Sequence, residues 1–482
     1  MQTIFLKNKF YISKQNLAIL FICLVSRLPA TIFYIEDIDS LRFALSAVDY
    51  NVLESRPHFP AYPVYCFGLI IIYNIVGNIG IAFSIIGALS IYLIIHFSRK
   101  IWRLYSNKSD LALILIILLN PLLWLLSNRY MPDIFGLALL MAGLYYFIAA
   151  LKFNQKKHFI LLGIIVALEI GVRLSFIPFF IPVAYLLTRS KVKYTIVSFV
   201  ITCLAWFIPL ALKTGFQELI NVSQRGTSGH FYDWGGTIMS SDTSPLTRLI
   251  RMFEFIFVDG FSFWTLSRNW LVAINSVFLS CFLVMGTYII IKYFKKRLDT
   301  TFILVSLAFI CYAIWVYFFQ NISYKSRHII PFIPVICFVI ALGISNMFTK
   351  RQWFRYAIVA TGFTVYATIS IILVTQHKSP SALSQINDFL YVQPQKTVVL
   401  SNPLKNYYWN YHKDTDHIRF INIENDQYTQ LLQEQYEEGN IIYSTHNLVD
   451  DLGNASEVYN FYHNPHVNRL WSHLKLYKYE KD

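Results

Sequence analysis

The sequence is poor in charged residues. Only 14% of its 482 residues are charged, whereas 56% are hydrophobic and 17% are aromatic. A soluble protein of this length cannot bury so much apolar surface. The composition therefore excludes an ordinary soluble protein and predicts an all-α polytopic membrane protein whose main solvent is lipid.

Cysteine is scarce as well, and the sequence lacks CxxC and metal-like cysteine spacings. We expect the six isolated cysteines to be small core side chains, and none follows Cys337, so the carboxyl-terminal region is predicted to fold without disulfides. The six are Cys23, Cys66, Cys203, Cys281, Cys311 and Cys337. An internal repeat is also missing, which counts against a repeat-built transporter.

The chain does contain many apolar stretches long enough to cross a membrane. The first of them lacks a small-x-small cleavage pattern, so we expect a retained span and not a cleaved signal peptide. The stretch 160–187 is divided at Arg173-Leu174-Ser175 into two short spans. We predict about eleven transmembrane helices: 17–34, 79–97, 111–126, 134–151, 158–172, 176–187, 194–212, 270–291, 301–319, 329–347 and 354–374.

The net charge of +14 comes from basic clusters between the spans. These clusters are topology signals and not a nucleic-acid surface, and they place the amino terminus inside and the carboxyl terminus outside. Usage of Ile, Lys and Asn favours a bacterium, hence an inner-membrane protein whose site faces the periplasm or exterior. An endoplasmic reticulum membrane is the alternative that the sequence leaves open. The predicted cytoplasmic clusters are Lys7/Lys9/Lys14, Arg99/Lys100/Arg103/Lys108, Lys152/Lys156/Lys157, Arg189/Lys191/Lys193, Lys292/Lys295/Lys296/Arg297 and Lys350/Arg351/Arg355.

The pattern divides the chain into two predicted domains. Residues 1–377 form the transmembrane domain, with outer loops at 35–78 and 213–269. Residues 378–482 form a small soluble extracytoplasmic α/β domain, because 13 of the 27 acidic residues fall there and apolar runs shrink to strand length. Its expected elements are strands 397–400, 418–423, 441–444 and 474–479 and a helix at 427–437.

The sharpest local signal is the acidic run Glu36-Asp37-Ile38-Asp39-Ser40, because carboxylates beside hydrocarbon are costly without a task or partner. The apolar residues that follow recur at helical spacing, which predicts an interfacial helix with Asp39 at its N-terminus. Asp39 then either caps the helix or acts as a general base on an acceptor hydroxyl. Asp37 assists it, or the two acids bind a divalent ion.

Prolines at every third position of the segment 57–63 forbid a regular helix and predict a stiff extended segment that fixes His58 and Tyr62 near the acids. The apolar run 64–76 that follows is too short to span and is predicted to be a second interfacial helix.

Further charged residues lie at the predicted outer ends of other spans. Lys325 and Arg327 are suited to hold a phosphate, or are ordinary loop and headgroup contacts. Glu169 and Arg173 are four residues apart on one helix and could neutralise each other. Arg129, Asp133 and Tyr324 face the same side.

The order of these features resembles the GT-C glycosyltransferases, which take a sugar from a polyprenyl-phosphate carrier. The similar segments are Asp39-Ser40-Leu41-Arg42-Phe43-Ala44 (first-loop acidic motif), Pro57 to Tyr65 (HPPGYPLY-type segment), Pro132-Asp133 (second acidic site), Gly171-Val172-Arg173-Leu174-Ser175 (GxRPS-type stretch) and Ser326-Arg327-His328 with 329–334 (RYLLPLLP segment). The protein O-mannosyltransferase and lipid A aminoarabinose transferase branches are the most similar in organisation.

The resemblance implies a hexosyltransferase of GT-C type that acts on a protein, lipid or glycan acceptor and inverts the sugar carbon. Asp39 matches the catalytic acid, with Asp37 as its neighbour. No cofactor is required, although Mg or Mn at Asp37 and Asp39 is an alternative. The alternatives in function are a transporter or flippase for a lipid-linked or anionic solute, and a non-catalytic assembly factor. The implied substrate-binding residues are Arg42, His58, Tyr62, Arg129, Asp133, Arg173, Tyr324, Lys325 and Arg327.

Overall fold

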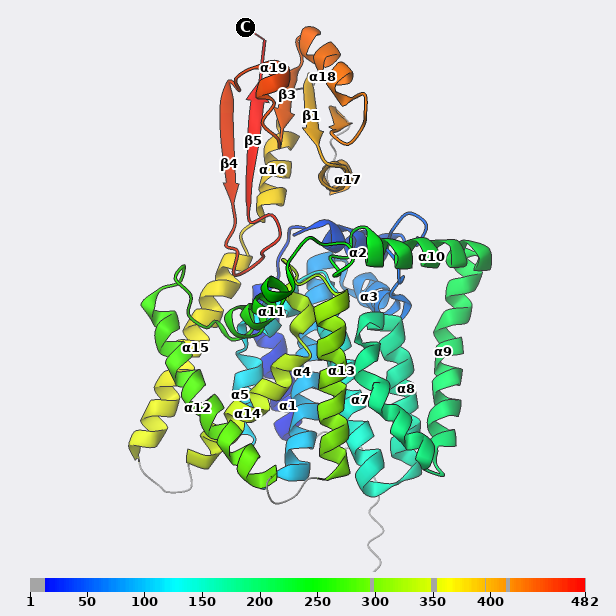
Figure 1. The fold of residues 1–482 in the computed structure, drawn as a ribbon, viewed down its shortest axis with the longest axis vertical. Helices are drawn as coiled ribbons and strands as arrows, with labels where there is room; N and C mark the ends of the chain where they lie inside the picture. Colours follow the sequence, from blue (N-terminus) through cyan, green and yellow to red (C-terminus); the bar gives the residue numbers. More distant parts are fainter. Residues whose placement is uncertain (1–13, 295–298, 348–352, 395, 413–416, 482) are drawn as a thin grey trace, which may run out of the picture.

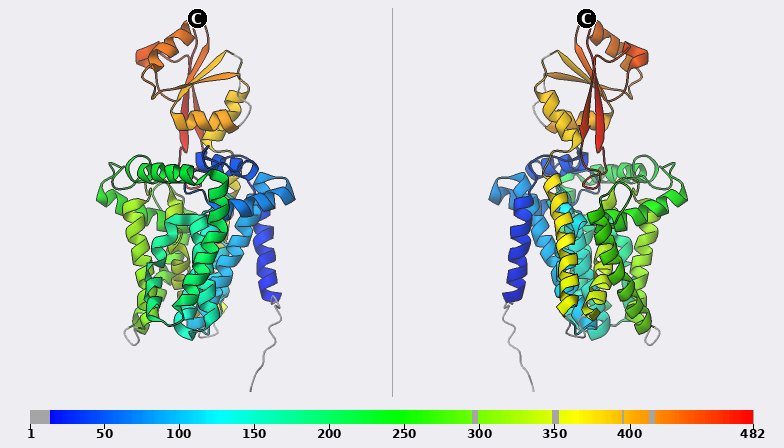
Figure 2. Two further views of the ribbon diagram at one scale, coloured as in Figure 1. Left: turned by 90° about the vertical axis from the view of Figure 1, so that its right-hand side faces the viewer. Right: turned by 90° about the vertical axis from the view of Figure 1, so that its left-hand side faces the viewer.

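A computed structural model describes residues 14–294, 299–347, 353–394, 396–412 and 417–481. The chain forms a bundle of long helices with a small sheet domain at one end, and a layer of short helices lies between the two (Figures 1 and 2). The predicted basic residues Lys7, Lys9, Lys295, Lys296, Arg297, Lys350 and Arg351 lie outside the described residues.

Each of the eleven predicted spans coincides with a helical element of the bundle. These elements are α1 (Lys14–Arg27), α4 (Ile79–Tyr105), α5 (Leu111–Leu118) with α6 (Pro121–Asn128), α7 (Asp133–Phe153), α8 (Lys156–Arg173), η2 (Leu174–Thr188), α9 (Val192–Thr214), α12 (Trp270–Phe294), α13 (Thr300–Phe319), α14 (Phe332–Met347) and α15 (Trp353–His377). By length and hydropathy the described residues contain seven spanning helices, or eight if the bent pair α5 and α6 is one span. The chain is therefore a multi-pass membrane protein, and the number eleven stays a prediction.

Part of the difference between eleven predicted spans and seven or eight spanning helices lies at α8 and η2. These two helices together form one apolar stretch, Lys156–Thr188. η2 is a 3₁₀ helix of 15 residues; at about 2 Å per residue it is roughly 30 Å long, enough to cross hydrocarbon, where an α-helix would be too short. Phe180 of η2 lies against Gly143 of α7, next to Ile165 of α8. Leu186 clusters with Phe159 near the start of α8, so η2 returns alongside α8.

The break between α5 and α6 has a local cause. The two helices meet at 52°. Pro121 is the first residue of α6, and the Asn120 side chain caps α6 by accepting a hydrogen bond from the Leu123 backbone N–H at 3.0 Å. The apolar pattern continues across this break, so the sequence predicted a single span at 111–126.

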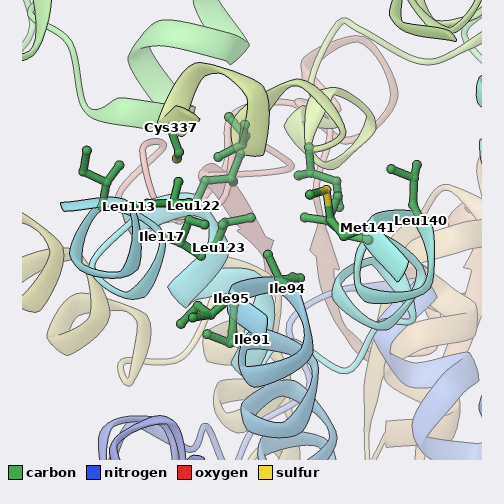
Figure 3. Packing of buried hydrophobic residues seen from close by; sticks show 14 of the residues in the cluster. Ile91, Ile94, Ile95, Leu113, Ile117, Leu122, Leu123, Leu140, Met141 and Cys337 are labelled. Carbon is green, nitrogen blue, oxygen red and sulfur yellow. The ribbon is translucent and has the colours of Figure 1, made fainter. Parts of the chain in front are cut away.

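The bundle is held together by branched apolar side chains from several helices (Figure 3). Residues shown there include Ile91, Ile94 and Ile95 of α4, Leu113 and Ile117 of α5, Leu122 and Leu123 of α6, Leu140 and Met141 of α7, and Cys337 of α14. Of the cysteines predicted to be core residues, Cys23, Cys66 and Cys337 are buried, whereas Cys203 and Cys311 are half-buried. The prediction was wrong for Cys281, which is exposed on the apolar helix α12, where the surrounding lipid takes the place of a protein core.

The layer between the bundle and the sheet domain, called the outer layer below after its predicted orientation, consists of short elements. They are η1 (Leu28–Ala30), α2 (Ile38–Val48), α3 (Pro63–Val76), α10 (Phe216–Tyr232), α11 (Pro245–Glu254), η3 (Phe255–Asp259) and η4 (Ser326–Ile329). The two helices predicted after the acidic run and after the prolines are α2 and α3. α3 starts at Pro63 and ends at Gly77, which adopts a left-handed conformation with φ of 66°. α2 lies between the bundle and the sheet domain (Figure 2), and α3 packs beside α2 against α4 and α8 of the bundle.

The carboxyl-terminal domain contains a five-stranded sheet in the order β2-β1-β3-β5-β4. β1, β2 and β3 run parallel, and β5 runs antiparallel to both β3 and β4. Its elements are α16 (Ala382–Tyr391), β1 (Thr397–Ser401), α17 (Pro403–His412), β2 (Ile418–Asn422), α18 (Tyr428–Glu437), β3 (Ile441–Ser444), α19 (Val449–Leu452), β4 (Glu457–Tyr462) and β5 (His473–Tyr479). Ile38 and Leu41 of α2 join the core of this domain, so the sheet domain is docked directly on the helix that carries the acids.

Candidate active site

The two candidate acids lie at the start of α2. Asp37 is the N-cap residue: its backbone is extended, with φ of −155°, and its carboxylate accepts a hydrogen bond from the Ser40 backbone N–H at 2.8 Å. Asp39 lies in the first turn of the helix. The suggestion that Asp39 caps the helix was wrong, because Asp37 fills that position. The Asp39 carboxylate is consequently available to other groups.

Asp39 is surrounded by basic side chains, two of which, Lys325 and Arg327, come from a distant part of the chain. Its Oδ2 atom lies 2.5 Å from Nη2 of Arg327 and 3.1 Å from Nζ of Lys325. Its Oδ1 atom lies 3.9 Å from Nη1 of Arg42 and 4.0 Å from Nδ1 of His58. The predicted base and the predicted phosphate-binding cations are thus in direct contact.

These contacts separate the charge states of the two acids. Burial alone would raise the pKa of Asp39, but Lys325 and Arg327 outweigh it and hold that pKa well below its usual range. Burial and the negative charge of Asp39 raise the pKa of Asp37. Asp39 is therefore the ionised member of the pair while Lys325 and Arg327 contact it.

His58 and Tyr62 form one wall of this charged cluster. Burial lowers the pKa of His58 to about 3, although the charge of Asp39 opposes the shift, so the imidazole is neutral. The Tyr62 hydroxyl lies 3.3 Å from Nε2 of His58, and both rings pack edge-on against Phe43 of α2. A neutral imidazole and a phenol can each exchange hydrogen bonds with sugar hydroxyls.

The segment that holds these two side chains is not extended, contrary to the prediction from its prolines. Ala61 and Tyr62 adopt left-handed conformations with φ of 71° and 47°, and the Ala61 N–H donates to the His58 carbonyl at 3.0 Å. The prolines exclude a regular helix, as expected, but they are compatible with tight turns as well as with an extended chain.

A second ion pair lies beside the first. Nη2 of Arg173 lies 2.7 Å from Oδ1 of Asp133, and Nε of Arg327 lies 4.0 Å from the same oxygen. Arg173 also approaches Nδ1 of His328 at 3.4 Å. Asp133 therefore links Arg173 to Arg327 and thereby to Asp39.

This arrangement shows whether Glu169 and Arg173, four residues apart on α8, neutralise each other. Its carboxylate is fully buried and has no hydrogen-bond partner among the described residues. Arg173 directs its guanidinium to Asp133 and not to Glu169. The suggested neutralisation within α8 was therefore wrong, because a carboxylate on the neighbouring helix α7 is better placed.

Arg129 lies apart from Asp39. Its guanidinium pairs with both carboxylate oxygens of Glu36, at 2.8 and 2.9 Å, and donates to the Val467 carbonyl at 2.5 Å. His377 lies 3.4 Å from the same Glu36 carboxylate. Arg129 thus ties the first outer loop to α15 and to the carboxyl-terminal domain.

A small cavity connects these groups. It has a volume of about 10 Å³, which is room for roughly one water molecule. Its lining residues are Asp37, Arg129, Tyr324, Lys325, Ser326, Arg327, Asn468, Arg469 and Leu470. The last three come from the connection between β4 and β5 and were not identified from the sequence, which has no motif there. Tyr324, which was predicted to bind substrate, also lines the cavity.

The donor set does not fit a divalent metal ion. Asp39 is neutralised by Lys325 and Arg327 at hydrogen-bond distance, and Asp37 caps α2. Among the described residues, no group of three His, Cys, Asp or Glu side chains is arranged to hold a metal. Mg²⁺ prefers several oxygen ligands, and these two carboxylates are already engaged by other partners.

Comparison with known proteins identifies the fold. No family model matches the sequence, and no curated protein matches it. Two crystal structures of ArnT from Cupriavidus metallidurans match the whole chain. The one bound to undecaprenyl phosphate has a TM-score of 0.55 at 10% identity and covers 97% of this chain and 98% of its own. The apo structure has a TM-score of 0.55 at 12% identity and covers 95% and 97%. The chain therefore has the fold of these two ArnT structures over nearly its whole length, which agrees with the resemblance of its sequence motifs to GT-C glycosyltransferases.

Proposed function

We propose that the chain is a membrane glycosyltransferase that moves a sugar from a polyprenyl-phosphate-linked donor to an extracytoplasmic hydroxyl of a protein, lipid or glycan. The contact of Asp39 with both Lys325 and Arg327 carries this proposal. A general base beside two phosphate-binding cations is the set of groups that a single displacement needs. The fold supports it, because one ArnT structure contains undecaprenyl phosphate.

The geometry gives Asp39 two states. Without donor, Lys325 and Arg327 bind its carboxylate and hold its pKa well below the usual range, against the effect of burial, so Asp39 is a weak base. A donor phosphate competes for the same two cations, because guanidinium and ammonium groups bind phosphate as well as carboxylate. Donor binding therefore raises the basicity of Asp39 when the reaction needs it.

The chemical step then follows. The acceptor hydroxyl gives its proton to Asp39 while its oxygen forms a bond to the sugar carbon. The bond from that carbon to the phosphate oxygen breaks, and the electron pair stays on the phosphate, where Lys325 and Arg327 stabilise the growing charge. One displacement inverts the sugar carbon.

The other predicted residues support this arrangement. Arg42 and His58 approach Oδ1 of Asp39, whereas Lys325 contacts Oδ2, and Tyr62 lies against His58. We assign these three side chains to sugar or acceptor hydroxyls. Asp133 and Arg173 position the Arg327 guanidinium. The hexosyl identity of the sugar and the class of acceptor remain parts of the proposal.

Transfer of labelled sugar tests the proposal against the transporter alternative. Purified full-length protein in detergent, with a polyprenyl phosphate sugar and an acceptor extract, should release labelled product, because transfer requires no sealed compartment. Movement of the lipid-linked sugar across sealed vesicles without any transfer product would instead support a flippase. Mass spectrometry of cell-envelope glycans with and without the chain would then identify the acceptor.

A further inference from the structure

The segment between β4 and β5, residues 463–472, leaves its own sheet and reaches the outer ends of the spans (Figure 1). Val467 joins an apolar cluster with Ala30, Trp124 and Leu373 of the bundle. The Val467 carbonyl also accepts the hydrogen bond from Arg129. This β4–β5 segment therefore packs on the membrane domain and forms one side, or wall, of the cavity at the candidate site.

Arg469 attaches the β4–β5 segment to the membrane domain through ion pairs. Its guanidinium donates to both carboxylate oxygens of Asp259, at 2.8 and 2.7 Å, and to Glu254 at 3.0 Å. Both acids belong to the outer layer of the membrane domain, in α11 and η3. Bidentate arginine–carboxylate pairs are strong but can be broken and remade, so they suit a closure that opens.

The cavity under the wall is too small for the proposed substrate. About 10 Å³ holds roughly one water molecule and not a phosphate group. The β4–β5 segment contributes Asn468, Arg469 and Leu470 to this cavity, opposite Lys325 and Arg327. A phosphate that binds both cations therefore requires the segment to move outward from the position seen here and then to pack over the ligand.

The side chain of Asn468 indicates which chemical class of ligand fits the cavity. Its side chain is only 7% exposed, and its carboxamide oxygen accepts a hydrogen bond from the Leu470 N–H at 3.0 Å. Its NH₂ group has no partner among the described residues, and a buried donor without a partner is destabilising. The cavity also carries four cationic side chains. A site rich in donors is complementary to an anion rich in acceptors.

We propose that Asn468 donates a hydrogen bond to the phosphate of a polyprenyl-phosphate ligand, and that the β4–β5 segment is a movable wall that closes over this phosphate. The inference rests on the proposed function and adds to it a binding residue from the carboxyl-terminal domain. Arg469 holds the wall in the closed position.

The substitution Asn468→Asp tests this inference, because it keeps the size and the accepting oxygen but replaces the donor by a negative charge. Undecaprenyl phosphate binding to the purified full-length protein is measured for wild type and variant. We expect at least a tenfold loss of affinity. Asn464→Asp is the matched control, because Asn464 lies in the same segment, outside the cavity, and donates a hydrogen bond to Gln376. The affinity of this variant for undecaprenyl phosphate should stay within twofold of the wild-type value. Asn468→Ala removes the donor without adding charge and should also weaken binding.

Two further measurements complete the test. Hydrogen exchange of the amides of residues 463–472 should slow when undecaprenyl phosphate is bound, and unchanged exchange would overturn the movable wall. Inorganic phosphate and phosphatidylglycerol at equal concentration should not displace the ligand; displacement by either would assign the cavity to a free anion or a common headgroup and overturn the inference.

The outcomes separate this inference from the function on which it rests. Wild-type protein that binds and transfers, together with Asn468 variants that bind equally well, would overturn the inference alone. Wild-type protein that binds no undecaprenyl phosphate would overturn both.

Discussion

Nη2 of Arg327 lies 2.5 Å from Oδ2 of Asp39, although the two residues are 288 positions apart in the sequence. One belongs to η4 and the other to α2, and both lie in the outer layer between the bundle and the sheet domain. The fold therefore places a candidate base and a phosphate-binding cation in a single hydrogen bond. Any ligand phosphate must compete with Asp39 for this cation.

Replacing the base tests this competition. Asp39→Asn should lower sugar transfer by about 10²- to 10⁴-fold, the usual contribution of general base catalysis. Undecaprenyl phosphate should bind at least as tightly as in the wild type, because Lys325 and Arg327 lose their carboxylate partner. Transfer rate and affinity are measured on the same preparation.

Asp49→Asn serves as the control, because Asp49 is exposed and pairs only with Arg56 among the described residues. Normal transfer by Asp39→Asn in membranes would remove Asp39 from the base role.

Removing a cation should have the opposite effect on binding. Arg327→Gln and Lys325→Gln should each weaken undecaprenyl phosphate binding by roughly 10- to 100-fold, the size of a charge-assisted hydrogen bond. Equilibrium binding in nanodiscs measures the change. Lys378→Gln, at an exposed lysine outside the cavity, is the control and should leave the affinity unaltered. If all three variants bind with equal affinity, Lys325 and Arg327 do not bind the phosphate.

The positions of the helices could be predicted from the sequence because each span must bury an apolar stretch of sufficient length. The outer acids could also be predicted, since uncompensated charge beside lipid is conspicuous. Strand β4 was missed. All six of its residues, from Glu457 to Tyr462, are exposed or half-exposed at the edge of the sheet, so no buried face produces an alternating apolar pattern.

The partners of the charged residues could not be predicted, because periodicity describes one element and pairing depends on how distant elements meet. Arg173 has Glu169 one turn away in sequence, yet it pairs with Asp133 on another helix. Arg129 lines the cavity, but its pairing with Glu36 could not be predicted. Asn468 lies in a connection without any motif, and only its packing against the membrane domain brings it to the cavity.

The Asp133–Arg173 pair should be structural as well as functional. Asp133→Asn leaves the buried guanidinium without a carboxylate and should lower the free energy of unfolding by about 3–5 kcal/mol, measured by denaturation in detergent. Adding Arg173→Met should recover more than half of this loss, because the unpaired charge is gone. Asp233→Asn, at an exposed acid, should change stability little; a similar loss there would show that the measurement reports charge in general.

The Glu36–Arg129 pair predicts how stability depends on pH. Burial would raise the pKa of Glu36, but Arg129 and His377 outweigh it and lower this pKa from 4.5 to about 2. Because the folded-state pKa lies below the unfolded one, the ionised carboxylate stabilises the fold above pH 4.5, and this contribution is lost as the pH falls toward 2. It amounts to about 3 kcal/mol.

Glu36→Gln should therefore be less stable than wild type at pH 7, and the difference between the two should shrink at pH 3. Thermal unfolding in detergent at both pH values measures it, with Glu424→Gln as the control because Glu424 is exposed. A difference that is equally large at pH 3 would mean that the Glu36 carboxylate does not need its charge to hold Arg129. In that case the link from the first outer loop through Arg129 to Val467 would depend on packing and not on the ion pair.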